Sequence, residues 1–125
     1  MTIQAVIDAI DELKPNMIPA RQKIAWLSEL DGKVFREVLM THEGMPAGIE
    51  FKGYDQDERP DTVLLIPDDY AEVYQHYLAA EIDNVQRETN EYTKNMMRFN
   101  ASWQTFCDYW NRTHMPRQIV RQFRL

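Results

Sequence analysis

A row of large apolar side chains near the end of the chain places the strongest constraint on the fold. The spacing between successive members alternates between four and three residues, which is the a/d pattern of a helix that buries one seam against another helix. The row lasts for nearly three heptads, a length that suits a helix pair or a small bundle better than an autonomous coiled coil. Its members are Tyr92, Met96, Phe99, Trp103, Phe106 and Trp110.

Apolar residues at helical spacing also predict two helices in the first half of the chain. The first is expected over residues 3–13, where Thr2 can cap its start and Pro15 ends it. The second is expected over about residues 19–43 as one continuous helix. Pro19 lies in its first turn, where a missing N–H costs nothing.

A third helix is predicted to begin at Asp68, which follows Pro67 and is a favourable N-cap residue. Its apolar positions continue at helical spacing as far as Val85. Residues 84–90 are polar and indicate the turn into the aromatic helix, which is expected to end at Pro116.

Residues 44–67 interrupt the helical pattern. They contain three of the four glycines and three of the six prolines of the chain. Residues 49–51 and 62–66 are short extended pieces that could pair as a small β-hairpin. Otherwise this segment is a long loop inserted between the second and third helices.

These patterns predict an all-α fold, a small bundle of about four helices that carries this insertion and a C-terminal tail. The chain of 125 residues is long enough for one core, so we expect a single helical domain over residues 1–114 and a tail over residues 115–125. Six prolines and four glycines are too few for a turn-rich all-β domain, and 11% aromatic residues are too many for a disordered chain.

The formal net charge of -6 is unevenly distributed. Residues 112–125 carry four arginines and no acidic residue, whereas the remaining 111 residues hold ten basic and twenty acidic groups. The lone Cys107 excludes a disulfide framework and fits a reducing compartment. The sequence shows no run of ~18 apolar residues and no signal-peptide pattern. We therefore expect a soluble intracellular protein.

The candidate chemical motifs are weak. Glu72 and His76, four residues apart, could place two metal ligands on one helix face, but a site needs a further ligand, and a surface polar pair is the alternative. Cys107 lies beside the aromatic row. At such a position a cysteine acts more often as a small buried apolar side chain than as a reactive thiol. The acidic run at 55–61 lacks the glycine and glutamate of a calcium loop. We predict no catalytic, metal or cofactor site, and a protein that is not an enzyme.

The tail combines apolar anchors with arginines. It is either a frayed terminus or a docking peptide for a groove with an acidic or phosphate-bearing rim. Burying its apolar side chains would contribute roughly 6–12 kcal/mol, whereas ordering its backbone costs roughly 11–22 kcal/mol. One tail should therefore bind weakly, and many tails of one oligomer should bind effectively. The candidate docking residues are Arg117, Ile119, Val120, Arg121, Phe123, Arg124 and Leu125.

Several stretches, in the same order along nearly the whole chain, resemble the head–tail connector proteins of tailed bacteriophages and prophages, also called adaptor or head-completion proteins. None of these stretches is catalytic, so the resemblance bears on architecture and role. They are residues 3–16, IAWLSELDGKV at 24–34 with THEG at 41–44, FKGYD at 51–55, LLIPDDY at 64–70, YQHYLAAEID at 74–83 and YWNRTHMP at 109–116.

This resemblance implies a helical subunit that assembles into a ring beneath the portal, in the neck of the virion, after synthesis in the host cytoplasm. The ring would extend the DNA channel, with DNA passing through without specific binding. The implied partners are the portal protein, which the C-terminal segment would engage, neighbouring copies of the chain and a downstream neck or tail-completion protein, with no membrane. The insertion is expected to reach a neighbouring subunit through Ile49, Phe51, Tyr54, Val63 and Leu65.

Two other functions compete with the structural one. A DNA-binding or DNA-packaging accessory protein would use the tail arginines on phosphates, and its non-specific DNA affinity would fall steeply with salt. A small enzyme or metal protein would centre on Glu72 and His76.

Overall fold

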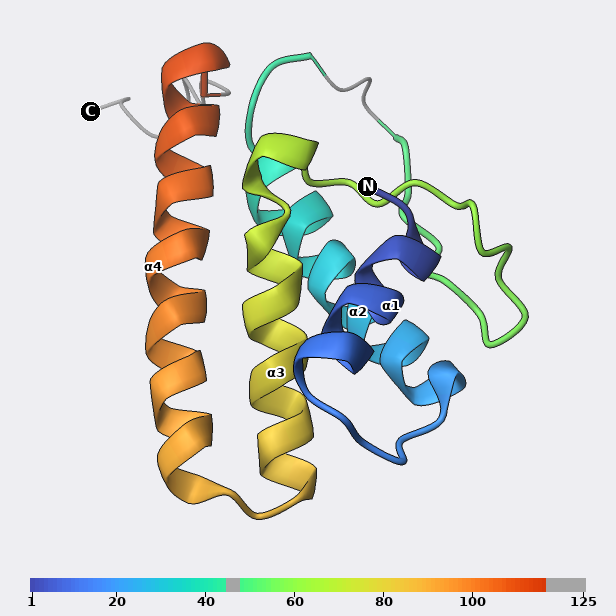
Figure 1. Ribbon diagram of the computed structural model, residues 1–125. Coiled ribbons are helices and arrows are strands. Elements are labelled where there is room, and N and C mark those ends of the chain that lie inside the picture. The colour runs from blue at the N-terminus through green and yellow to red at the C-terminus, as the bar shows by residue number, and fades with distance from the viewer. Residues whose placement is uncertain (45–47, 117–125) are drawn as a thin grey trace.

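The computed structural model describes residues 1–44 and 48–116, and these residues form a mostly helical structure. The expected all-α class is thereby confirmed. Four α-helices follow one another in the described chain, together with a π-helical segment η1 and a short 3-10 helix η2 (Figure 1). Their bounds are α1 Ile3–Leu13, α2 Ala20–Val34, η1 Phe35–Leu39, η2 Asp68–Tyr70, α3 Glu72–Val85 and α4 Thr89–Thr113.

Helix α3 is the centre of the bundle. It packs against α1, α2 and α4, and Figure 1 shows it between α4 on one side and the α1–α2 pair on the other. Tyr74, Leu78 and Ile82 of α3 are fully buried. Because every other α-helix packs on α3, the apolar positions of α3 contact the core residues of all of them.

The aromatic row lies in one helix as expected, but it is not uniformly buried. Phe99 and Phe106 are buried, whereas Tyr92, Met96, Trp103 and Trp110 are half-buried. The reason is that α4 packs mainly on α3 and, near its end, on η2. One neighbouring helix covers the centre of an a/d seam and leaves its flanks partly exposed to solvent.

The first helix follows the sequence signals closely. The hydroxyl of Thr2 accepts a hydrogen bond from the Ala5 N–H at 3.2 Å, which satisfies a free donor at the helix start. The helix ends before Pro15, and Asn16 then orders the turn that leads to α2. The Asn16 side chain donates to the Lys14 carbonyl oxygen at 2.9 Å and accepts from the Ile18 N–H at 3.0 Å.

The second helix is shorter than the continuous helix predicted over residues 19–43. Its α-helical part ends at Val34, and a π-helical segment follows in which the Met40 N–H donates to the Phe35 carbonyl oxygen at 2.9 Å. The five-residue step of a π-helix changes the side-chain register. Phe35, Val38 and Leu39 remain on the core side in the new register.

The predicted role of Asp68 as the N-cap of the third helix is wrong. Asp68 begins η2, α3 begins at Glu72, and the start of α3 has no side-chain cap. The Asp68 carboxylate instead forms an ion pair with the amino group of Met1. The amino group at the chain start lies close enough to pair with this carboxylate because the chain start also pairs with the residues around Val63, as described next.

The described part of the insertion, residues 48–67, is a long loop, and the alternative of a hairpin between residues 49–51 and 62–66 does not form. The second of these pieces pairs with the chain start: Val63 and Thr2 form an isolated antiparallel bridge. The Leu64 N–H donates to the Met1 carbonyl oxygen at 2.8 Å. Residues 62–66 therefore pair with the distant chain start and not with the nearby residues 49–51.

Two glycines in this loop give a matched test of backbone strain. Gly48 and Gly53 both have positive φ, at +84° and +81°. A Cβ at Gly53 would lie 2.7 Å from the Ser28 hydroxyl oxygen, which accepts a hydrogen bond from the Tyr54 N–H, whereas a Cβ at Gly48 meets nothing within 4 Å. Gly53→Ala should lower the free energy of unfolding by about 2–3 kcal/mol, and Gly48→Ala by about 1 kcal/mol. Urea denaturation of both variants measures the difference, and equal losses would contradict a steric role for Ser28.

No helix in the described part of the chain is long and apolar enough to span a membrane.

Candidate functional site

The seven candidate docking residues of the tail lie outside the described residues. The structure does describe the point from which the tail leaves. The Glu43 N–H donates to the Met115 carbonyl oxygen at 2.8 Å, and His42 and Pro116 form an isolated antiparallel bridge. The chain is thus attached to the turn that follows η1 until immediately before Arg117.

Buried His42 reinforces this attachment. Its Nδ1 lies 2.7 Å from the Val38 carbonyl oxygen, and its Nε2 lies 2.6 Å from the side-chain amide of Asn111 on α4. Next to Asn111, the Trp110 ring stacks on the ring of His114, the residue that follows α4, with centroids 3.7 Å apart. These contacts connect η1 to the last turn of α4 and determine the origin of the tail.

Of the five insertion residues expected to contact a neighbouring subunit, three pack against their own core and two are exposed. Phe51, Tyr54 and Leu65 pack against the core of their own chain. Ile49 and Val63 are 42% and 66% exposed, and of the five they are the two with large exposed apolar surface.

Asp31 on α2 explains why the insertion packs inward. This fully buried carboxylate accepts hydrogen bonds from the Tyr54 hydroxyl at 2.5 Å, the Tyr74 hydroxyl at 2.6 Å and the Leu65 N–H at 3.0 Å. The Tyr74 hydroxyl in turn accepts from the Ile66 N–H at 2.8 Å. One carboxylate therefore joins α2, α3 and both sides of the insertion.

The electrostatics of this Asp31 cluster follow from burial. Burial raises the pKa of Asp31, against the opposing effect of the three hydrogen bonds it accepts. Burial and the neighbouring Asp31 carboxylate likewise raise the pKa of Tyr54 and Tyr74, so both phenols remain protonated donors. With its oxygens occupied by structural donors, Asp31 anchors the insertion.

A second buried carboxylate, Asp83, holds the other end of the bundle together. Asp83 of α3 forms an ion pair with Lys14 at 2.5 Å and accepts a hydrogen bond from the Asn95 amide of α4 at 2.6 Å. This arrangement joins the end of α1, the end of α3 and the start of α4.

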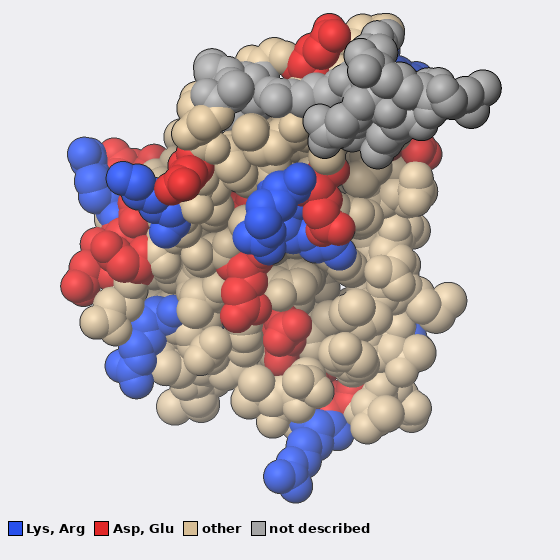
Figure 2. Space-filling view, turned by 180° about the vertical axis from the view of Figure 1, so that it is seen from behind, with Lys and Arg blue, Asp and Glu red and all other residues tan. Residues whose placement is uncertain are grey.

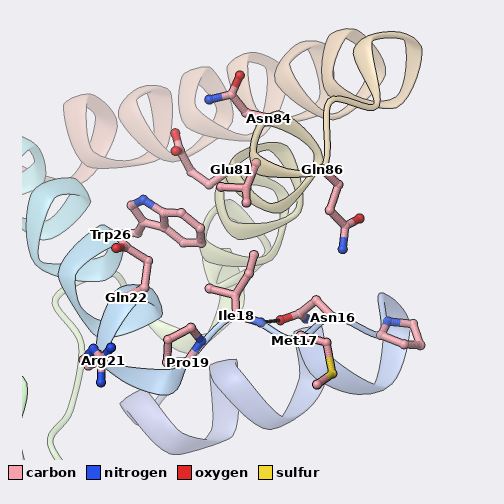
Figure 3. A pocket seen from close by; sticks show the side chains of 12 residues that line it. Asn16, Met17, Ile18, Pro19, Arg21, Gln22, Trp26, Glu81, Asn84 and Gln86 are labelled. Atoms are coloured by element: carbon pink, nitrogen blue, oxygen red, sulfur yellow. Dashed lines mark hydrogen bonds between the residues drawn. The ribbon is translucent and has the colours of Figure 1, made fainter.

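An open cavity of about 990 Å³, here called the Trp26 groove, lies at this same end of the molecule. Its apolar lining includes Ile18, Trp26 and Val85, and Figure 3 shows Trp26 and Ile18 below Glu81. The Met17 side chain is 98% exposed on the turn beside it. The complete lining is Pro15, Asn16, Met17, Ile18, Pro19, Arg21, Gln22, Trp26, Glu81, Asn84, Val85 and Gln86.

Within the described residues, the weak chemical motifs do not combine into a metal site. Glu72 is exposed and His76 half-buried on α3, and no group of three or more His, Cys, Asp or Glu within the described ranges is placed to hold a metal ion. Burial lowers the pKa of His76 and raises that of Cys107, which keeps the imidazole and the thiol uncharged. In the acidic run, the Asp55 carboxylate accepts from the Asp57 N–H, and Asp61 pairs with Arg59.

Charges of both signs are mixed on the face seen in Figure 2. Basic and acidic side chains alternate there between broad uncharged areas, and the described residues on this face form no large patch of one sign. Such a surface does not resemble the continuous basic footprint of a nucleic-acid-binding domain.

No family model, curated protein or solved structure matches this chain.

Proposed function

We propose that this protein is a structural subunit of the bacteriophage neck, a head–tail connector that forms a ring under the portal, joins the DNA-filled head to the tail and extends the DNA channel. The observation that carries the proposal is the attachment of Met115 and Pro116 to the turn that follows η1, which fixes the point on the helical body at which the basic and apolar segment begins. The sequence resemblance to connector proteins assigns that segment to the portal protein.

The helical body supports an assembly role. Its two buried carboxylates, Asp31 and Asp83, are occupied by structural hydrogen bonds and an ion pair. Exposed Ile49 and Val63 supply apolar surface for a neighbouring copy in the ring. The opposite side of the ring would receive the downstream neck protein.

The distribution of charge supports passage of DNA without specific binding. The chain before residue 112 has ten more acidic than basic groups, so the body should not attract a duplex in transit. If the protein were a DNA-packaging accessory instead, the tail arginines would bind phosphates. DNA affinity would then be measurable in the isolated chain and would fall steeply with salt.

Removal of the tail should abolish portal binding. A truncation ending at Pro116 keeps the Glu43–Met115 hydrogen bond, so the helical body should remain intact, as circular dichroism can verify. Light scattering of portal mixtures should show a complex with the full chain and none with the truncation. A truncation that joins the portal as tightly as the full chain would refute the docking role of the tail.

Two full-length variants separate the contributions of the tail. Replacing Ile119, Val120 and Phe123 with serine removes the apolar anchors, and replacing the arginines with glutamine removes the charge. We expect the first variant to lose portal binding at all salt concentrations. The second should lose the salt-sensitive part of the affinity.

A further inference from the structure

We propose that the Trp26 groove of one copy binds the C-terminal tail of a second copy, so that isolated chains associate head to tail. The groove is an open apolar cavity, and the tail is a basic segment with apolar anchors. This inference does not depend on the neck function, because both binding elements belong to the same chain.

The groove is a preformed binding surface. Trp26 is almost fully buried and Val85 is 55% exposed, so the groove runs from the core to the surface. Its wall at the α1–α2 turn is held rigid by the Asn16 hydrogen bonds and by prolines at both ends of the turn. A rigid groove loses little conformational entropy when an apolar side chain enters it.

The groove lining carries one acidic and one basic side chain, Glu81 and Arg21, and the wall at Glu81 favours a basic side chain of the occupant. The pKa of Glu81 is raised by burial and by the nearby carboxylate of Glu29. In the part of the chain that the structure describes, neither carboxylate has an ion-pair partner. Figure 3 shows Arg21 of the lining away from Glu81, beyond Trp26 and Gln22. A cation near Glu81 would therefore relieve the repulsion between two acidic groups.

The tail has the matching chemistry. Residues 117–125 contain three arginines, at 117, 121 and 124, and four large apolar residues. The spacing of Val120, Arg121 and Phe123 allows an apolar anchor and a guanidinium to be presented together. An arginine can donate two parallel hydrogen bonds to a carboxylate.

Geometry favours a tail that comes from another molecule. The groove lies between the α1–α2 turn, the start of α2 and the end of α3, whereas Pro116, the last described residue, lies beyond the far end of the 25-residue helix α4 (Figure 1). A helix of that length spans ~37 Å. The nine tail residues extend at most ~31 Å, and Phe123 lies only ~24 Å along the chain from Pro116. Only a nearly extended tail could bring its last residues toward the groove of its own chain, whereas the tail of a second copy can enter the groove without that constraint.

A contact between opposite ends of identical subunits is heterologous and can be repeated. Such contacts close into rings or continue as filaments, depending on the rotation between subunits. Because the portal would use the same tail, portal binding and this self-association should exclude each other.

A synthetic peptide of residues 117–125, acetylated at its N-terminus, tests the contact directly. Titrated into the truncation ending at Pro116, it should shift the NMR methyl signals of Ile18 and Val85 and change Trp26 fluorescence. Glu81→Lys should weaken this binding at least about tenfold, the effect expected from losing a hydrogen bond to a charged group. The matched control Glu72→Lys makes the same charge change at the opposite end of α3 and should bind the peptide normally. Val85→Asp, at the exposed rim, provides a second groove variant that leaves the core intact.

Mixing two defective chains tests the head-to-tail arrangement. The full-length Glu81→Lys chain has a tail without a working groove, and the wild-type truncation has a groove without a tail. Light scattering should show each chain monomeric alone, their mixture forming a dimer only, and the wild-type full chain forming larger species.

Three results would overturn the proposal. The first is the absence of peptide binding at millimolar concentration. The second is equal peptide binding by the Glu81→Lys and Glu72→Lys variants. The third is self-association of the full chain that survives removal of the tail, which would assign the contact to the helical bodies of two copies. None of these experiments involves the portal, so their failure leaves the neck function to be judged by its own test.

Discussion

Asp31→Ala should lower the free energy of unfolding by about 3–5 kcal/mol, a large part of the stability of a small domain. The substitution removes the acceptor of two phenol hydroxyls and one backbone N–H, and it leaves these donors buried without partners. Asp31→Asn keeps the size and one acceptor oxygen, so it should cost less, about 1–3 kcal/mol. Urea denaturation followed by circular dichroism measures both values. A loss below about 1 kcal/mol for the alanine variant would show that the cluster contributes little.

The pH dependence of the same variants tests the charge state of Asp31. Burial raises the pKa of Asp31 above its ordinary value of 3.8, so the folded protein binds this proton more tightly than the unfolded chain does. Between that value and the raised pKa, acidification should therefore stabilise the wild type relative to Asp31→Asn. The difference in unfolding free energy between the two proteins should be larger at pH 4.5 than at pH 7. A difference that shrinks on acidification would mean that the hydrogen bonds outweigh burial and hold Asp31 charged.

Phe106→Ala should have a comparable effect on stability, a loss of about 3–5 kcal/mol. Phe106 is fully buried where α4 meets η2, with the rings of Tyr70, Trp103 and Trp110 about 6 Å away, centroid to centroid. Its removal opens a cavity that these large rings cannot fill without leaving their rotamers.

Met97→Ala is the control for Phe106→Ala. Met97 lies on α4 with most of its side chain exposed, so its truncation should change stability by less than about 0.5 kcal/mol. Thermal unfolding monitored at 222 nm compares the two variants. Equal midpoints would mean that the α3–α4 contact does not depend on the aromatic row.

Local signals were sufficient to predict α1 and α4. Thr2 and Pro15 act within one turn of the helix they bound, and the aromatic row repeats over most of α4, so each helix follows from neighbouring residues. The predicted start of α3 is wrong because Asp68 has a partner, the chain start, that is distant in the sequence. The predicted end of α2 is wrong because the π-helical segment that follows it also keeps apolar residues on the core side, in a new register. The apolar pattern therefore continues past the real end of the α-helix.

The Asp31 cluster could not be predicted from the sequence for the same reason. Its donors lie 23 to 43 residues away along the chain, in a loop and in another helix. A lone aspartate within an amphipathic pattern gives no signal of such partners. The Trp26 groove is formed by the α1–α2 turn, the start of α2 and the end of α3, which only the packing of α2 on α3 brings together. The insertion could be recognised from the sequence as a candidate interaction segment. Its side chains that face inward could not be distinguished from those that face solvent.

The contacts that attach Met115 and Pro116 to the turn after η1 have a mechanical consequence. A force that pulls on the tail does not act on the last turn of α4 alone. The Glu43–Met115 hydrogen bond and the His42–Asn111 contact transmit part of this force to η1. From η1 the force passes through α2 to Asp31 and so into the insertion and α3. Tension applied to nine residues at one end is thereby distributed over most of the molecule, and the helix from which the tail emerges is protected from being unwound.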